Sequence, residues 1–264
     1  MSGSDAKAIT QALIDAVRGL GYDSISGDAL EVARHCLLDY LGVALAGSSE
    51  PLVQMLVKVV AVGDGPDEAG LIGRPERVSG LNAALINGAA AHALDYDDTH
   101  TTLMGHPTAP VMPAVLALCE TKGANGKRLL ESFVVGVELE CRLGALLGSG
   151  HYEAGFHSTG TLGTFGAAGA CAHLLGLGKD QWRMAMGLAG TQAAGLKASF
   201  GTMAKPLHAG KAASNGMLSA LLAKEGFSGA TGMLEAPQGF AVKHFGSDVL
   251  DLYTETKSVC IAMG

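Results

Sequence analysis

The stretch GTLGTFGAAGACAHLLGLG, residues 160–178, decides how the rest of the chain is interpreted. It contains no Asp, Glu, Lys or Arg, and its length would suit a helix that crosses a membrane. Gly, Ala and Thr supply most of it, however, and His173 interrupts the run. We therefore interpret this stretch as a buried helix that packs closely against other helices through small residues, and we expect no membrane span.

Helical periodicity recurs on both sides of this stretch, whereas alternating strand patterns are scarce and Val and Ile do not cluster. The pattern predicts an all-α fold. Gly, Pro and Asp punctuation separates the expected helices, and residues 61–80 form the longest loop-like segment between them. The expected helices are residues 5–20, 28–46, 51–62, 79–97, 109–122, 127–147, 160–175, 179–193 and 206–225.

Composition narrows the classes of partner. The chain has 264 residues, 48% of them hydrophobic, which is enough for a sizeable core. Its formal charge of −7 and the absence of a basic run argue against nucleic acid and against an anionic membrane surface, so a small-molecule partner is favoured. The five cysteines are scattered and form no C-x-x-C pair, which indicates neither a disulfide framework nor a zinc knuckle. With an amphipathic start that lacks a signal-peptide block, these features predict a cytoplasmic protein.

The segment AHALDYDDTH, residues 91–100, concentrates three carboxylates and two imidazoles in a chain that is poor in charge. If the helix expected at 79–97 continues to residue 99, three- and four-residue spacings place four side chains on one face. These side chains are His92, Asp95, Tyr96 and Thr99. We expect Asp97 and Asp98 to point elsewhere and to cap a helix end or loop. A carboxylate near the core, as at Asp95, requires a hydrogen-bond or ion-pair partner, or a functional role.

Three later segments place a protonatable cation next to an expected helix start. His106 precedes a proline-rich helix start, His157 precedes the capping residues Ser158 and Thr159, and Lys205 precedes Pro206. Free backbone N–H groups point out of a helix N-terminus, which attracts anions. Three converging helix starts would therefore suit a ligand with several carboxylates or phosphates. The sequence predicts this chemistry but does not show that the three starts converge.

At these residues the sequence resembles the MmgE/PrpD family, which includes 2-methylcitrate dehydratase, cis-aconitate decarboxylase and iminodisuccinate epimerase. The order and spacing of the shared segments agree over nearly the whole chain, to about Phe245. The segments are INGAAAHALDYDDTH (86–100), GHPTAPVMPAVLAL (105–118), GFHSTGTLGTFGAAGA (155–170) and GLKASFGTMAKPLHAGKAASNGMLSALLAKEGFSG (195–229).

The resemblance implies a pocket between a large helical domain and a smaller α/β lid domain, with no metal and no organic cofactor. By position, it implies Asp95 as base or positioning group, Thr99 as a donor to substrate, and Lys205 as charge stabiliser. His106, chosen over His100 for its helix-start context, and His157 are implied for proton transfer and carboxylate binding. These assignments make Asp95, His106, His157 and Lys205 the expected catalytic residues, and Thr99 and His208 the expected substrate-binding residues.

The shared chemistry of the family is removal of a proton, or of carbon dioxide, at a carbon next to a carboxylate. The sequence is accordingly expected to encode a cofactor-free lyase that acts on a small polycarboxylate, most simply a 2-methylcitrate dehydratase, and to form a homodimer. A decarboxylase or an epimerase of the same family stays open. Fixed cations beside the carboxylate would stabilise the charge that develops there.

The sequence also departs from the family. The resemblance implies that relatives are longer and include the lid domain, which we expect this chain to lack; we expect a helical domain at 1–246 and a divergent tail at 247–264. The short form is therefore expected to self-associate and to turn over substrate slowly, or to be an inactive truncated paralogue that serves as an oligomerisation partner.

The acidic segment at residues 91–100 suggests two other enzyme classes as alternatives. A magnesium-dependent, diphosphate-ionising enzyme of the all-α terpene type fails because no second Asp-rich block with helical spacing appears. A metal hydrolase remains as an alternative, and its ligands would be His92, Asp95, Asp98 and His100.

Overall fold

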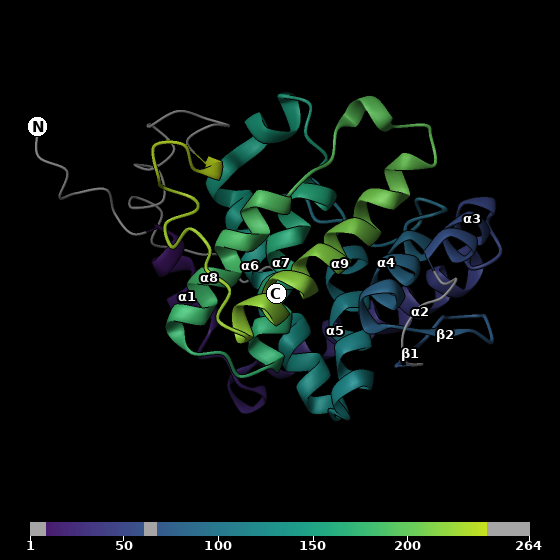
Figure 1. Ribbon diagram of the computed structural model, residues 1–264, viewed down its shortest axis with the longest axis horizontal. Helices are drawn as coiled ribbons and strands as arrows, with labels where there is room; N and C mark the ends of the chain where they lie inside the picture. The colour runs from purple at the N-terminus through teal and green to yellow at the C-terminus, as the bar shows by residue number, and fades with distance from the viewer. Residues whose placement is uncertain (1–8, 61–67, 242–264) are drawn as a thin grey trace, which may run out of the picture.

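The computed structural model describes residues 9–60 and 68–241, and these are predominantly helical, as Figure 1 shows. The prediction of an all-α fold is confirmed. Two short strands, β1 (Ala69–Gly70) and β2 (Arg77–Val78), pair antiparallel within the segment that we expected to be a loop. Residues 61–67 of that segment lie outside the described residues.

The helices begin and end close to the predicted positions for sequence-local reasons. The side chains of Ser26, Ser79 and Asn125 each accept a hydrogen bond from the amide three residues on, which caps the helix that follows. Gly123 adopts the left-handed conformation after α5 and ends it. The helices are α1 (Ile9–Val17), α2 (Gly27–Gly47), α3 (Pro51–Val60), α4 (Gly80–Ala91), α5 (Thr108–Lys122), α6 (Gly126–Glu153), α7 (Ser158–Leu174), α8 (Lys179–Gln192) and α9 (Ala204–Lys224).

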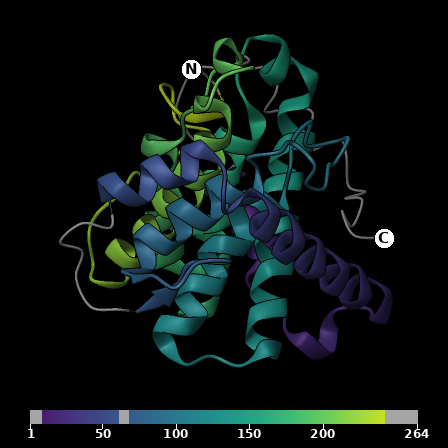
Figure 2. The ribbon, with the colours of Figure 1, turned by 90° about the vertical axis from the view of Figure 1, so that its right-hand side faces the viewer.

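The helix made of small residues, α7, is the centre of the fold. All of its residues from Ser158 to Ala172 are buried, and it packs against α5, α6, α8 and α9. The expectation of a buried helix is thus confirmed. Among the helices that the structure describes, no single one is both long and apolar enough to cross a membrane, although α2 and α3 pass that test together as a pair bent by 87°. These two helices face the viewer in Figure 2.

Glycines set how closely the central helices approach. A Cβ atom on Gly210 of α9 would lie 2.1 Å from the carbonyl oxygen of Leu85, and one on Gly88 of α4 would lie 2.9 Å from the Cα atom of Gly210. A Cβ atom on Gly216 would lie 2.5 Å from the Cβ atom of Ala167 in α7. Side chains at these crossings would force the helices apart. These three glycines therefore allow close backbone contact between α9 and its neighbours α4 and α7.

Two helices differ from the sequence expectation. α4 ends at Ala91 rather than continuing to Thr99, and Asp95 has a φ of 53°, in the left-handed region. The prediction that Asp95 and Thr99 share a helix face is therefore wrong: the chain turns after Ala91 and brings Asp97 back to the ring of His92. α6 runs to Glu153, beyond the predicted end, across a break at Gly148.

The crossing of α4 and α9 gives a stability prediction. Gly210→Ala should lower the free energy of unfolding by about 1–3 kcal/mol, because the added methyl group meets a backbone oxygen that cannot move freely. Gly42→Ala is the matched control, because nothing lies within 4 Å of its Cβ position; it should raise the free energy of unfolding by about 0.5–1 kcal/mol through helix propensity. Urea denaturation of both variants checks this, and equal effects would contradict it.

Candidate active site

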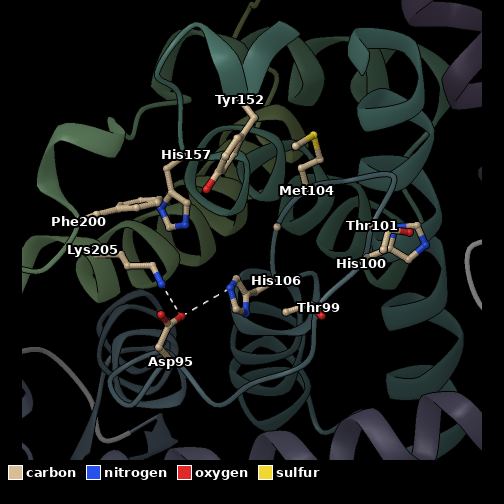
Figure 3. Close-up of a pocket in the computed structure, with 11 residues that line it drawn as sticks. Asp95, Thr99, His100, Thr101, Met104, His106, Tyr152, His157, Phe200 and Lys205 are labelled. Carbon is tan, nitrogen blue, oxygen red and sulfur yellow. Dashed lines mark hydrogen bonds and ion pairs between the residues drawn. The ribbon is translucent and has the colours of Figure 1, made fainter. Parts of the chain in front are cut away.

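Segments far apart in the sequence meet around one cavity of about 600 Å³, shown in Figure 3. Five of the six predicted site residues line it, and they come from the turn after α4 and from the starts of α5, α7 and α9. The convergence that the sequence left open is thus present in the structure. The lining residues are Asp95, Thr99, His100, Thr101, Met104, Gly105, His106, Tyr152, His157, Phe200 and Lys205.

Each of the three cationic residues occupies a helix start, as the sequence predicts. His106 stands two residues before Thr108, the first residue of α5; His157 is the N-cap residue of α7; and Lys205 is the second residue of α9. The backbone N–H of His106 donates to Oγ1 of Thr159 at 2.9 Å, which ties the α5 start to the first turn of α7. The N-terminal ends of these helices add positive potential at the cavity wall.

Asp95 pairs with Lys205 at the mouth of the cavity. The ammonium of Lys205 donates to Oδ1 of Asp95, and Nε2 of His106 lies 3.6 Å from the same oxygen. Partial burial acts to raise the pKa of Asp95, but the hydrogen bond and charge of Lys205 outweigh it and hold that pKa below its ordinary value. The Asp95 side chain is 57% exposed, so this carboxylate remains accessible to a ligand.

Asp97 is the main residue that the sequence analysis missed. We expected it to cap a helix, but it is buried and lies between two imidazoles: both oxygens are 3.0 Å from Nδ1 of His92, and Oδ2 is 3.3 Å from Nδ1 of His106. Asp98 does cap a helix, accepting from the backbone N–H of Thr108 at 3.2 Å. No sequence signal separates the two acids, because their roles depend on how the chain turns after α4.

The imidazoles on either side of Asp97 fix its charge. Burial acts to raise the pKa of Asp97, yet the hydrogen bonds from His106 and His92 hold it well below the ordinary carboxyl value. Burial likewise acts to lower the pKa of His106, and the Asp97 carboxylate outweighs it, so that pKa is raised. The result is a row of alternating groups, which we call the charge row: Lys205, Asp95, His106, Asp97 and His92.

His157 differs from the imidazoles of the charge row because no described carboxylate forms a hydrogen bond or an ion pair with it. It is 2% exposed; burial, and then the nearby basic side chains of His92, His208, Lys205 and His106, lower its pKa to about 2. The ring therefore stays neutral at pH 7 and can accept or donate a proton without carrying charge beforehand. The ring of Phe200 meets it edge-on, with centroids 5.0 Å apart.

The remaining predicted residues, Thr99 and His208, line two different cavities. Thr99 lines the main cavity. His100 lines it as well, but its Nδ1 atom accepts a hydrogen bond from the backbone N–H of Leu103, and Figure 3 shows its ring away from the Asp95–Lys205 pair. The preference for His106 over His100 agrees with this geometry. His208 does not line the main cavity; it lies behind His157 and lines a second cavity of about 280 Å³.

Two aromatic residues of the wall, Tyr152 and Phe200, were also missed. Tyr152 belongs to the last turn of α6, beyond the break at Gly148, where the sequence analysis had ended the helix. Phe200 follows the short 3-10 turn Lys197–Ser199 that leads into α9. Neither carried a signal, because a single aromatic residue in a loop-like segment is usually a packing residue.

The ligand set of the metal-hydrolase alternative is not assembled. Asp98 caps α5 and His100 turns toward Leu103, so neither joins the group at the cavity. Ligand atoms of four other residues do lie within 4.8 Å of one another: His92, Asp95, Asp97 and His106. Asp95 and Asp97, however, approach opposite nitrogens of the His106 ring, and Asp95 also pairs with Lys205, so these groups already partner one another. The geometry favours the charge row over a metal centre.

Sequence comparison agrees with this architecture. The sequence model described as the MmgE/PrpD N-terminal domain matches residues 11–252. The chain belongs to the MmgE/PrpD family. This MmgE/PrpD protein is 33% identical over 250 residues to a cis-aconitate decarboxylase of Aspergillus terreus, covering 92% of the chain and 51% of that protein. It is 30% identical over 240 residues to a cis-aconitate decarboxylase of Homo sapiens, covering 89% of the chain and 50% of that protein.

The MmgE/PrpD chain therefore spans about half the length of the curated relatives it matches. The predicted domain boundary at residue 246 and the tail at 247–264 lie outside the described residues. The family match ends at residue 252, six residues past that boundary, and the boundary itself stays a prediction.

The substitution Asp97→Asn tests the contact between Asp97 and His106 in the charge row. Removing the carboxylate charge should lower the pKa of His106 by about one unit or more, because an adjacent opposite charge typically shifts a pKa by that amount. NMR titration of the His106 ring checks this. Asp39→Asn is the control, because that exposed carboxylate of α2 is not in contact with His106. A pKa of His106 that is the same in Asp97→Asn as in the wild type would contradict the charge row.

Asp97 also predicts a pH dependence of stability. Its pKa is lower in the folded chain than the ordinary value of 3.8, so its contribution to the free energy of unfolding is complete above that value and is lost as the pH falls below it. Asp97→Asn should therefore cost roughly 3 kcal/mol at pH 7. The difference from the wild type should shrink below pH 4. Urea denaturation at several pH values checks this, and a constant difference would contradict it.

Proposed function

We propose that this chain carries the substrate-binding and proton-transfer half of a cofactor-free lyase that acts on a small polycarboxylate, with decarboxylation of cis-aconitate as the favoured reaction. The observation that carries the proposal is the convergence of His106, His157 and Lys205, each at a helix start, on one cavity. The relatives named as cis-aconitate decarboxylases support the choice of reaction. Dehydration of 2-methylcitrate is the second candidate, because the same cavity chemistry would serve it.

Positive charge in the cavity suits the electron flow of decarboxylation. When carbon dioxide leaves, the electron pair of the broken C–C bond stays on the carbon chain and spreads into a neighbouring carboxylate. Lys205, with 14% of its side chain exposed, and His106, with 15%, present donors to that carboxylate in a partly water-excluded wall. Fixed donors aimed at developing charge are worth about 10²–10³-fold in kcat each.

A proton must then reach the carbon that received the electron pair. His157 is the proposed donor, because its ring is neutral, faces the cavity and lies beside Lys205 and His106. In the dehydration alternative the same ring accepts a proton from carbon, and His106 donates to the departing hydroxyl. Asp95 positions Lys205, and the hydroxyl of Thr99 donates to a substrate carboxylate.

Turnover assays test the proposed function directly. Purified protein is incubated with cis-aconitate, 2-methylcitrate and iminodisuccinate, and product is followed by NMR. Conversion of cis-aconitate is expected; conversion of 2-methylcitrate alone would establish the dehydratase instead. A folded protein that converts none of them would contradict the lyase proposal and favour the oligomerisation-partner alternative.

Two variants test the site. His157→Ala should lower kcat by about 10²–10⁴-fold, the usual loss when a proton-transfer group is removed. Lys205→Ala should lower it by about 10²–10³-fold through lost charge stabilisation. The controls are His35→Ala and Lys224→Ala, which change exposed side chains on α2 and at the end of α9. Wild-type rates in both site variants would exclude these residues from the reaction.

We also propose that the chain forms a homodimer through the outer face of α2 and α3. This face exposes large apolar side chains: Leu38 is 71% exposed, Leu45 58% and Val59 77%. Exposed apolar surface of this kind marks an interaction site.

Replacing the apolar side chains with charge should separate the proposed dimer. Leu38→Lys with Val59→Lys is expected to halve the mass measured by light scattering, because two charges would have to be buried at the contact. Phe227→Lys is the control, because this side chain is 56% exposed on the turn after α9. A wild-type protein that is a monomer at all concentrations would contradict the proposal.

A further inference from the structure

His157 and His208 form a hydrogen-bonded pair that joins the two cavities. Their Nδ1 atoms are 3.1 Å apart, and their ring centroids are 5.3 Å apart. His157 lines the main cavity, whereas His208, four residues into α9, lines the second cavity. Polar side chains make up much of the second cavity wall: Thr164, Gln192, Ser199, His208, Lys211 and Asn215.

The contact between like atoms constrains the protonation of both rings. One Nδ1 must carry a hydrogen and the other must offer a lone pair, because neither two N–H groups nor two lone pairs form a hydrogen bond. A neutral His157 that accepts from His208 therefore carries its own hydrogen on Nε2. A neutral His157 that donates to His208 instead has a bare Nε2. The His208 ring thus determines whether Nε2 of His157 gives or takes a proton.

The surroundings of His157 favour a relay in which no ring holds a full charge. The groups packed around it are His92, stacked with centroids 5.6 Å apart, and Phe200, His106, His208 and Lys205. The nearest acids are already committed, because Asp95 pairs with Lys205 and Asp97 lies between His92 and His106. If His157 kept an extra proton, its ring would be positively charged next to other basic groups, and the nearby carboxylates are already paired elsewhere.

We propose that His208 is a positioning and proton-relay residue that connects His157 to water in the second cavity. This rests on the proposed function. When His157 gives its Nε2 proton to the substrate carbon, the Nδ1 proton of His208 moves to Nδ1 of His157. A water in the second cavity then gives a proton to Nε2 of His208, and the hydroxide that remains leaves to solvent, where it combines with the released carbon dioxide as bicarbonate. One N–H bond breaks and one forms on each ring, so both rings end neutral with their tautomers exchanged.

The same exchange runs in the opposite direction for a step that removes a proton from carbon. Nε2 of His157 gains the proton, its Nδ1 proton passes to His208, and Nε2 of His208 releases a proton to water. The relay therefore serves decarboxylation and dehydration alike. It also gives His208 a role different from the expected substrate binding, because this ring lies behind His157 and lines the second cavity rather than the main one.

His208→Asn separates hydrogen bonding from proton passage. The Asn amide is short enough to place a polar atom near the position of the Nδ1 atom, but it cannot accept a proton on one side and release one on the other. We expect kcat to fall at least about 10-fold with little change in KM, as for loss of a proton-transfer group. Added imidazole should restore part of the rate in His208→Ala. The control, His35→Asn, makes the same substitution at an exposed site on α2 and should keep the wild-type rate.

Nitrogen-15 NMR of the imidazole rings provides a readout that does not need turnover. The wild type should show complementary tautomers, with one of the two Nδ1 atoms protonated and the other bare. Two bare Nδ1 atoms would overturn the relay whatever the activity. Wild-type turnover that is unchanged in His208→Asn would overturn the relay alone, whereas a wild type without turnover on any of the three polycarboxylates would overturn the proposed function.

Discussion

Basic side chains that share one hollow either lose their charge, as His157 does, or have an acid placed between them. In this protein Asp95 separates Lys205 from His106, and Asp97 separates His106 from His92. The Asp97 contacts are buried away from bulk water, where such a contact is stronger than it would be on the surface. The acids therefore do more than neutralise charge. They hold the starts of separate helices at fixed distances and orient the His106 ring, with Nδ1 toward Asp97 and Nε2 toward Asp95.

The two acids are placed differently, and this difference has chemical meaning. Asp97 is buried and keeps both imidazole partners, so it acts as a permanent part of the scaffold. Asp95 is more than half exposed and adopts a left-handed backbone conformation, which Asp and Asn adopt more readily than most residues other than glycine. Under the proposed function, an entering carboxylate would compete with Asp95 for Lys205.

Much of this site follows from local sequence rules. Proline and hydroxyl residues after His106 and His157 predict helix starts there, and the structure has them. The end of α4 could not be predicted from these rules, because helical periodicity in the sequence continues through Asp95. In the structure the chain turns at His92 and brings Asp97 onto the His92 ring. Likewise, the contact of His208 with His157 depends on how α9 crosses α7. Tertiary contacts of this kind have no counterpart in the spacing of residues along one helix.

The glycine crossing of α4 and α9 links architecture to reactivity. Gly210 lies five residues after Lys205 on one rigid helix, and its partner Leu85 precedes the turn that carries Asp95. Adding one methyl group at the crossing would therefore displace two walls of the cavity together. A substitution that leaves the protein soluble would still alter the cavity by widening the gap between these two helices, and a compensating change would have to arise on the opposite helix.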